Sequence, residues 1–191
     1  NNQTSGTKEY GYAVFDRANR NYQQKEGINY VPHIPWNDVI IPGTQVDGIL
    51  HNHFLNYNNI FSPDDILLMA ELYIKGYVKD TNNFFMGIAS NTDAPYLIKV
   101  TNPAKFRIFA QKILALEVSN KWFTKTYDEK LRSGDNTKNL KAFFEMLEKH
   151  GGLAGLSVYE AVPDAGNYNF DKWKKLNWDG NGDFNASTDC F

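Results

Sequence analysis

Apolar positions fall into short runs in the first hundred residues and into helical stripes after them. The short runs are apolar or aromatic, a pattern that predicts buried or half-buried strands. These runs are Tyr10–Phe15, Val46–Leu50, Phe84–Ala89 and Tyr96–Val100. The last two are separated by turn-forming residues, which predicts a hairpin. The segment 31–43 carries three prolines and is expected to be a surface loop with at most a short helical turn.

The clearest helix start lies at Ser62. Its hydroxyl can cap a helix, and Pro63 suits the first helical position. Asp64 and Asp65 complement the positive end of the helix dipole. The apolar residues that follow cover most of the helix circumference, and Gly76 is well placed to end the helix. The sequence therefore predicts a helix that is buried on several sides.

Helical patterns dominate after residue 103. The first helix is predicted from one apolar stripe, formed by Phe106, Phe109, Ile113 and Leu116. Further helices are predicted at Trp122–Leu131 and Leu140–Leu147, and a strand at Leu156–Val162. The remaining tail is aromatic and polar with little periodicity. A chain of 191 residues suits one domain, here with a core at about residues 9–100 and a helical extension at about 103–191.

Composition and charge narrow the classes of function. The formal net charge is −2, with 20 basic and 22 acidic residues interspersed, so no nucleic acid partner is expected. No apolar run approaches the roughly 18–20 residues of a membrane span. The N-terminus lacks Met and a signal pattern, so the chain is expected to be a soluble, mature or excised fragment. Its compartment and oligomeric state stay open.

The candidate chemistry depends on histidine and carboxylate. The only cysteine is Cys190, so neither an internal disulfide nor a thiolate zinc site can form. His51 and His53 follow a predicted strand, where alternate side chains project together roughly 6 to 7 Å apart at the backbone. Asp65, in the first turn of the next helix, can supply a third ligand. Two histidines and one carboxylate leave a fourth position for water, as in catalytic zinc sites.

These residues carry a family resemblance. His51-Asn52-His53 followed by Ser62 to Asp65 resembles the His-x-His, seven residues, Ser-x-x-Asp signature of JAMM metalloenzymes in the JAB/MPN superfamily, and the His-Asn-His is similar to RadC-type members. Here eight residues, 54–61, separate the two parts. A one-residue insertion keeps both Ser62 and Asp65, because loops absorb extra residues easily. Strict spacing would instead make Asp64 the third ligand.

The resemblance implies a role for each matched residue. His51, His53 and Asp65 would bind zinc, and Ser62 would help to hold the oxyanion of the tetrahedral intermediate. The family also places a general base, a glutamate, on an upstream strand. Glu9 is the preferred residue because it directly precedes the first predicted strand. The alternative base is Glu26, in the segment Gln23–Gly27, which is predicted to be a polar turn.

The resemblance, which covers residues 9 to about 100, also implies a fold and a function. The fold would be α+β, with a central mixed β-sheet flanked by helices as in JAB/MPN (cytidine-deaminase-like) proteins and with a helical C-terminal portion. The function would be zinc-dependent hydrolysis of peptide or isopeptide bonds, with a peptide or protein substrate. The alternative is a non-catalytic JAB/MPN-like binding or scaffold domain, which could be part of a larger secreted or toxin-associated protein.

Three other features are assigned no chemistry. His33, between two prolines, and His150, beside a helix end, are expected at the surface. The segment Asp179–Asp183 resembles the opening of a calcium loop, but Phe184 stands where the loop needs glycine. It is predicted to be a turn.

Overall fold

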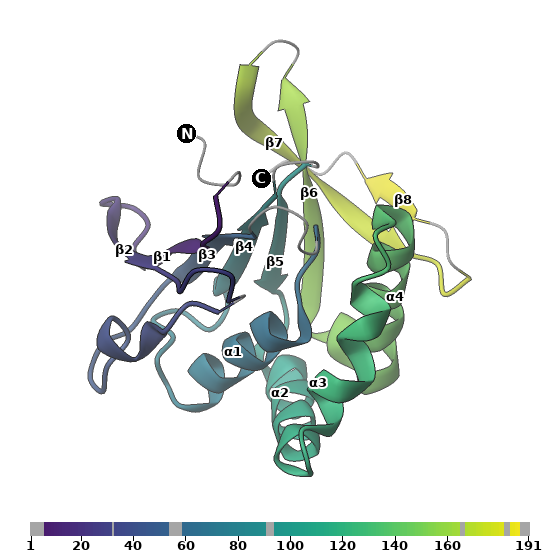
Figure 1. Ribbon diagram of the computed structural model, residues 1–191, viewed down its shortest axis with the longest axis horizontal. Coiled ribbons are helices and arrows are strands. Elements are labelled where there is room, and N and C mark those ends of the chain that lie inside the picture. Colours follow the sequence, from purple (N-terminus) through teal and green to yellow (C-terminus); the bar gives the residue numbers. More distant parts are fainter. Residues whose placement is uncertain are drawn as a thin grey trace.

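A mixed β-sheet is the centre of the protein (Figure 1). The computed structural model describes residues 6–31, 33–53, 59–90, 94–164, 167–181 and 184–187. Within these residues the sheet has eight strands in the order β2-β1-β3-β4-β5-β6-β7-β8. The pair β3 and β4 is parallel, and all other neighbouring strands are antiparallel. The strands are β1 (Tyr10–Asp16), β2 (Asn21–Glu26), β3 (Gly48–Asn52), β4 (Phe85–Ala89), β5 (Tyr96–Val100), β6 (Leu156–Asp164), β7 (Asn167–Trp178) and β8 (Phe184–Ser187).

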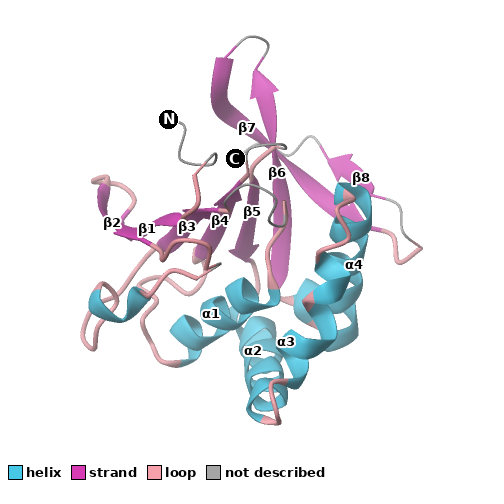
Figure 2. Cartoon of the chain, in the orientation of Figure 1, coloured by secondary structure: helices cyan, strands magenta, loops and turns pink. Residues whose placement is uncertain are grey.

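Four α-helices of the described residues are gathered beside the sheet, at the bottom and on the right of Figure 2. They are α1 (Pro63–Ile74), α2 (Pro103–Val118), α3 (Trp122–Tyr127) and α4 (Asn136–His150). The described residues also form three short 3-10 helices: η2 (Trp36–Asp38) between β2 and β3, η3 (Glu129–Leu131) between α3 and α4, and η4 (Gly152–Ala154) between α4 and β6. The predicted α+β class with a mixed sheet and helices is therefore confirmed. No described helix is both long and apolar enough to span a membrane.

The helix α1 lies beside the sheet and contacts α2 and α3 (Figure 1). Ser62 caps it, Pro63 occupies its first turn, and Gly76 follows it with a φ of +77°. Its side chains Ile66 and Met69 are fully buried. This confirms the prediction of a buried, capped helix, whose first turn is held at the end of β3.

Two regions differ from the sequence-based expectation. Residues 23–27 were expected to form a polar turn, but residues 21–26 form the strand β2, which pairs with β1 in a register that sets Tyr12 opposite Gln24. Five of the six β2 residues are exposed. Because β2 is an edge strand held by backbone pairing, its residues show no pattern of buried positions.

The helices of the C-terminal portion end with α4 at His150 and the short η4 at Gly152–Ala154. The strands β6, β7 and β8 then add to the sheet next to β5, so the expected helical extension at about 103–191 is wrong for the tail. Trp178 of β7 stacks on Phe144 of α4 with ring centroids 5.8 Å apart. Its indole Nε1 also donates to Glu148 Oε2 at 2.9 Å. These contacts attach the tail to the last helix.

Candidate metal centre

The end of β3 carries the two candidate histidines. His51 lies within β3, between β1 and β4, opposite Gly11 and Ile88. His53 follows the strand, and its backbone N–H donates to Ala89 O at 3.0 Å, which continues the pairing with β4. The side chains of His51 and His53 therefore come from a backbone that is fixed by the sheet.

The first turn of α1 presents Asp65 to these histidines. The Ser62 backbone N–H donates to Asp65 Oδ2 at 2.7 Å, and the Asp65 backbone N–H donates to Ser62 Oγ at 3.2 Å. This is a reciprocal capping box. The Ser62 hydroxyl also bonds Asp65 Oδ2, at 2.8 Å. Helix capping thus fixes the orientation of the carboxylate.

Two imidazoles and one carboxylate meet in this arrangement. His51 Nε2 lies 3.0 Å from Asp65 Oδ1, and His53 Nε2 lies 3.5 Å from Asp65 Oδ2. The two Nε2 atoms are 3.3 Å apart. The side chains are buried, with exposed fractions of 4% for His51, 2% for His53 and 13% for Asp65. The three residues could hold a metal ion, since their ligand atoms all lie within 4.8 Å of one another.

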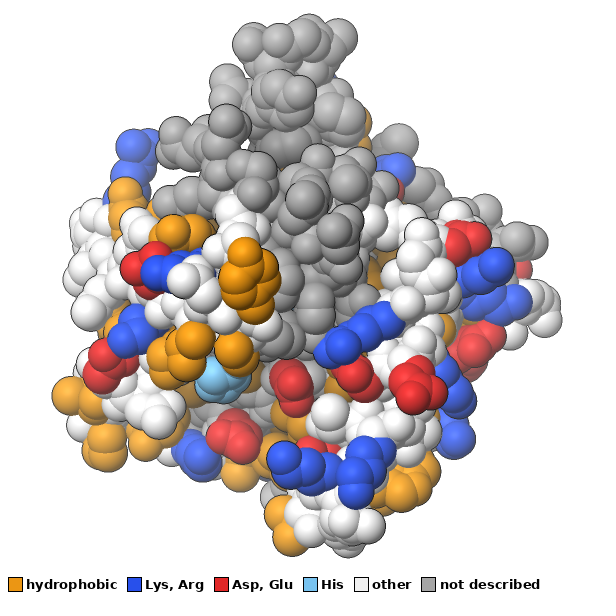
Figure 3. All heavy atoms as spheres, viewed as in Figure 1, with side chains coloured by type: hydrophobic (Ala, Val, Ile, Leu, Met, Phe, Trp, Pro, Cys, Tyr) orange, Lys and Arg blue, Asp and Glu red, His pale blue; other side chains and the backbone are white. Residues whose placement is uncertain are grey.

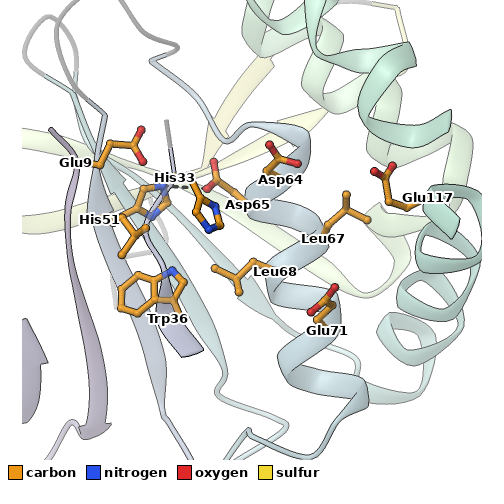
Figure 4. Close-up of a pocket in the computed structure, with 11 residues that line it drawn as sticks. Glu9, His33, Trp36, His51, Asp64, Asp65, Leu67, Leu68, Glu71 and Glu117 are labelled. Carbon is orange, nitrogen blue, oxygen red and sulfur yellow. Dashed lines mark ion pairs between the residues drawn. The ribbon is translucent and has the colours of Figure 1, made fainter. Parts of the chain in front are cut away.

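A cavity of about 320 Å³ opens beside the three residues (Figure 4). Figure 4 shows Glu9 and His51 on the strand side of the cavity, facing Asp64 and Asp65 on α1. The remaining wall is formed by both apolar and charged side chains: His33, Ile34, Trp36, Leu67, Leu68, Glu71 and Glu117. His51 and Asp65 are therefore accessible to a small ligand although both are largely buried.

Glu9 directly precedes β1 and is only 4% exposed. Its Oε1 is buried and has no hydrogen-bond partner among the described residues. Burial raises the pKa of Glu9 to about 7; His53 opposes this rise, and the negative charges of Asp65 and Asp64 add to it. A carboxylate that titrates near neutral pH beside a cavity can accept and return protons.

Asn52, which the sequence analysis did not assign, joins Glu9 to the histidines. Its Oδ1 accepts from the backbone N–H of Tyr10 at 2.5 Å, across 42 residues of sequence. The other side of Glu9 is held by Gly27, whose N–H donates to Glu9 O at 2.8 Å. A Cβ on Gly27 would lie 2.9 Å from His33 O, so the close approach requires glycine. No local pattern reveals such contacts between distant segments.

The alternatives left open by the sequence are placed differently. Asp64 is exposed, is not one of the three converging residues, and bonds Thr124 Oγ1 at 3.4 Å. Desolvation, Asp65, Asp128 and Glu117 raise its pKa. The geometry thus favours Asp65 as the ligand. Residues 54–58, in which the extra residue of the spacing would fall, lie outside the described residues.

Glu26, the alternative base, lies away from the cavity. It is an exposed residue of β2 whose carboxylate pairs with Lys8 Nζ at 2.7 Å and accepts from Tyr10 Oη at 3.2 Å. These two hydrogen bonds, that from Lys8 first, lower the pKa of Glu26. Of the two glutamates, Glu9 is the one beside the histidines.

The other unassigned features also have defined positions. His33 is exposed, as expected, and forms part of the cavity wall. His150 was expected at the surface but is only 6% exposed. Its Nε2 is 2.8 Å from Tyr127 Oη, because the last turn of α4 packs against α3. Asp179 Oδ1 accepts from the Asn181 backbone N–H at 2.7 Å, as in a turn; residues 182 and 183 lie outside the described part of the chain.

Asp65 carries the strongest electrostatic signature of the site. Burial by itself would raise the pKa of this carboxyl, but the charges and hydrogen bonds of His51 and His53 hold it well below its usual range. The carboxylate is therefore ionised and faces two ring nitrogens.

Comparison with known proteins adds no assignment, since no protein-family model, no curated protein and no solved structure matches the chain.

Proposed function

We propose that the protein is a zinc-dependent hydrolase of peptide or isopeptide bonds, with the architecture and JAMM-type site of the JAB/MPN superfamily. One observation carries the proposal. His51 and Asp65, which converge with His53, line the same cavity as Glu9, whose buried Oε1 has no hydrogen-bond partner among the described residues. The candidate ligands His51 and Asp65 and the candidate base Glu9, which lie far apart in sequence, thus line one cavity.

The donor set fits zinc. Two ligands bound at about 2.0–2.1 Å to a tetrahedral ion lie about 3.3 Å apart. His51 Nε2 and His53 Nε2 are 3.3 Å apart; the first lies 3.0 Å from Asp65 Oδ1 and the second 3.5 Å from the other carboxylate oxygen, Oδ2. Imidazole and carboxylate are ordinary zinc ligands. When bound, zinc would supply Lewis-acid chemistry, which lowers the pKa of a water toward about 7 and polarises a carbonyl.

The chain's own residues supply the remaining functions. Glu9 Oε1 would take a proton from the attacking water and return it to the leaving amine. The hydrogen bond from Tyr10 N to Asn52 Oδ1 positions Glu9 beside the histidines. Ser62 orients Asp65 through its backbone and its hydroxyl. Ile34 and Trp36, buried side chains in the cavity wall, restrict the water around the reacting groups.

The position of Ser62 favours a second candidate, a non-catalytic binding domain that keeps the metal. The resemblance assigns the Ser62 hydroxyl to the oxyanion of the intermediate. In the structure the hydroxyl lies 2.8 Å from Asp65 Oδ2, and an ionised carboxylate can only accept, so the hydroxyl donates its single proton there. This arrangement suits a structural role for Ser62 and leaves the oxyanion to another donor.

Hydrolysis of a mixed peptide pool by zinc-loaded protein distinguishes the two candidates. The enzyme proposal predicts cleavage that stops on chelation and returns with added zinc. Glu9→Gln should retain zinc and lose about 10²–10⁴-fold in rate, the usual contribution of a general base. The control is Glu26→Gln, which should cleave normally. Zinc binding without cleavage in the wild-type chain would support the binding domain instead.

A further inference from the structure

Carboxylates crowd the cavity beyond the three candidate ligands. Five of its eleven lining residues are acidic, and no Lys or Arg is among the lining residues that the structure describes. The five are Glu9, Asp64, Asp65, Glu71 and Glu117. On the face shown in Figure 3, acidic side chains lie near an exposed histidine and hydrophobic side chains. The cavity therefore combines negative charge with apolar surface.

A charge balance singles out two of the five carboxylates. The double positive charge of a divalent ion would balance the negative charges of Glu9 and Asp65, because neutral imidazoles add no charge. Glu71 is paired with Lys75 at 2.9 Å. Asp64 and Glu117 form no ion pair with any described residue, and both contact Thr124: Asp64 through the hydroxyl at 3.4 Å and Glu117 through the backbone N–H at 2.9 Å. Because these donors are neutral, two negative charges stay uncompensated.

Apolar side chains line the cavity beside this pair of carboxylates. In Figure 4, Leu67 lies between α1 and Glu117, while Leu68 points toward Trp36. An aliphatic stem with a cationic end suits such a wall, since lysine and arginine bury their methylenes on apolar surface and keep the charge at polar groups. Independently, Glu9 lines this cavity too, is only 4% exposed, and has a buried Oε1 without a hydrogen-bond partner among the described residues, which indicates that a ligand group completes it.

We propose that the substrate places a lysine or arginine side chain in this cavity. The cationic group would lie between Asp64 and Glu117, with its stem along Leu67, while the scissile carbonyl lies at His51 and Asp65. This inference rests on the proposed hydrolase function, because only a hydrolase would have a substrate to bind here. The preference for a cation itself rests on the cavity wall and can be measured without turnover.

Binding of two small probes tests the inference. The probes are Nα-acetyl-lysine amide, which keeps its cationic side chain, and its nearly isosteric neutral counterpart, Nα-acetyl-norleucine amide. Each would be titrated into the full chain, with zinc added, and its binding followed by NMR. The lysine probe should bind about tenfold more tightly, with a preference that shrinks at high salt. Asp64→Asn and Glu117→Gln should each lower the affinity for lysine about fivefold and leave that for norleucine unchanged.

The matched control is Glu145→Gln, which removes the same charge from an exposed position on α4 outside the cavity wall and should change neither affinity. Equal affinities of the two probes for the wild-type chain would overturn the inference. Circular dichroism checks that each variant is folded. If Asp64→Asn does not fold, the Glu117→Gln variant alone tests the inference.

Peptide cleavage separates this inference from the proposed function. Cleavage enriched next to Lys or Arg supports both. A lysine-selective cavity in a chain that cleaves nothing supports the cation site and contradicts the hydrolase. Cleavage without any preference for a basic residue supports the hydrolase and contradicts the cation site.

Discussion

Histidines are buried in two regions of this protein, with different neighbours. At the end of β3, His51 and His53 face the carboxylate of Asp65 and border a cavity. At the end of α4, His150 faces the phenol of Tyr127, and the ring of Phe123 lies at a centroid distance of 5.7 Å. All three histidines are at most 7% exposed, so the burial of the histidine alone does not distinguish the two regions. What distinguishes the end of β3 is the Asp65 carboxylate and its convergence with two imidazoles.

The difference also appears in the electrostatics. Burial lowers the pKa of His150, and the positive charges of Lys112 and Lys149 lower it further. That ring is thus kept neutral in a surrounding that disfavours added positive charge. Asp65, Asp64 and Glu9 make the opposite surrounding at the end of β3, where a cation is stabilised. In this protein the anionic groups distinguish the candidate ligand histidines from His150.

The largest expected effect separates the two aspartates of α1. Asp65→Asn should weaken zinc binding at least about 100-fold, because loss of a direct ligand should exceed the 10–100-fold typical of an outer partner. Ser62→Ala, which removes such a partner, should cost about 10-fold. Asp64→Asn should keep zinc. Competition with a fluorescent chelator measures all three, and stronger loss in Asp64→Asn than in Asp65→Asn would reverse the ligand assignment.

Much of the site could be predicted from the sequence because its signals are local. Ser62 and Asp65 lie three residues apart in a helix cap, and His51 and His53 lie two apart at a strand end. In both cases the spacing sets the geometry. The buried helix α1 and the strands β1, β3, β4 and β5 were likewise predicted from apolar runs.

The elements that were missed have no such local signal. The residues of β2 are nearly all exposed, so pairing with β1 leaves no alternation of apolar and polar positions. The strand β7 has only an interrupted alternation, because the apolar residues Phe170, Trp173 and Leu176 do not fall on one face of the strand; of its described side chains, Leu176 is buried. The link from Tyr10 to Asn52 and the burial of His150 by α3 depend on contacts between segments far apart in sequence.

A smaller effect is expected on stability against pH in the zinc-free chain. Folding raises the pKa of Glu9 from 4.5 to about 7, so the native state holds this proton more tightly than the unfolded state. Stability should therefore fall as pH rises from 4.5 to 7, by about 3 kcal/mol from this group, and change no further above 7. Urea unfolding of wild-type and Glu9→Gln chains measures it; parallel pH profiles would contradict the assignment.

The smallest effect concerns the second histidine region. Tyr127→Phe removes the hydroxyl bonded to His150 Nε2 and should lower the free energy of unfolding by about 1 kcal/mol. Zinc affinity should be unchanged, because α3 and α4 supply none of the three candidate ligands. Thermal unfolding and the chelator competition measure the two quantities. A loss of zinc in this variant would show that the two regions are not independent.

Metal content tests the central claim most directly. The wild-type chain, equilibrated with zinc and desalted, should retain about one zinc per chain by atomic emission, since the site supplies three protein ligands. His51→Ala should retain almost none, while His33→Ala, which removes an exposed histidine of the cavity wall, should retain as much as wild type. Wild-type protein with no retained zinc, or equal retention in His51→Ala, would contradict the metal centre.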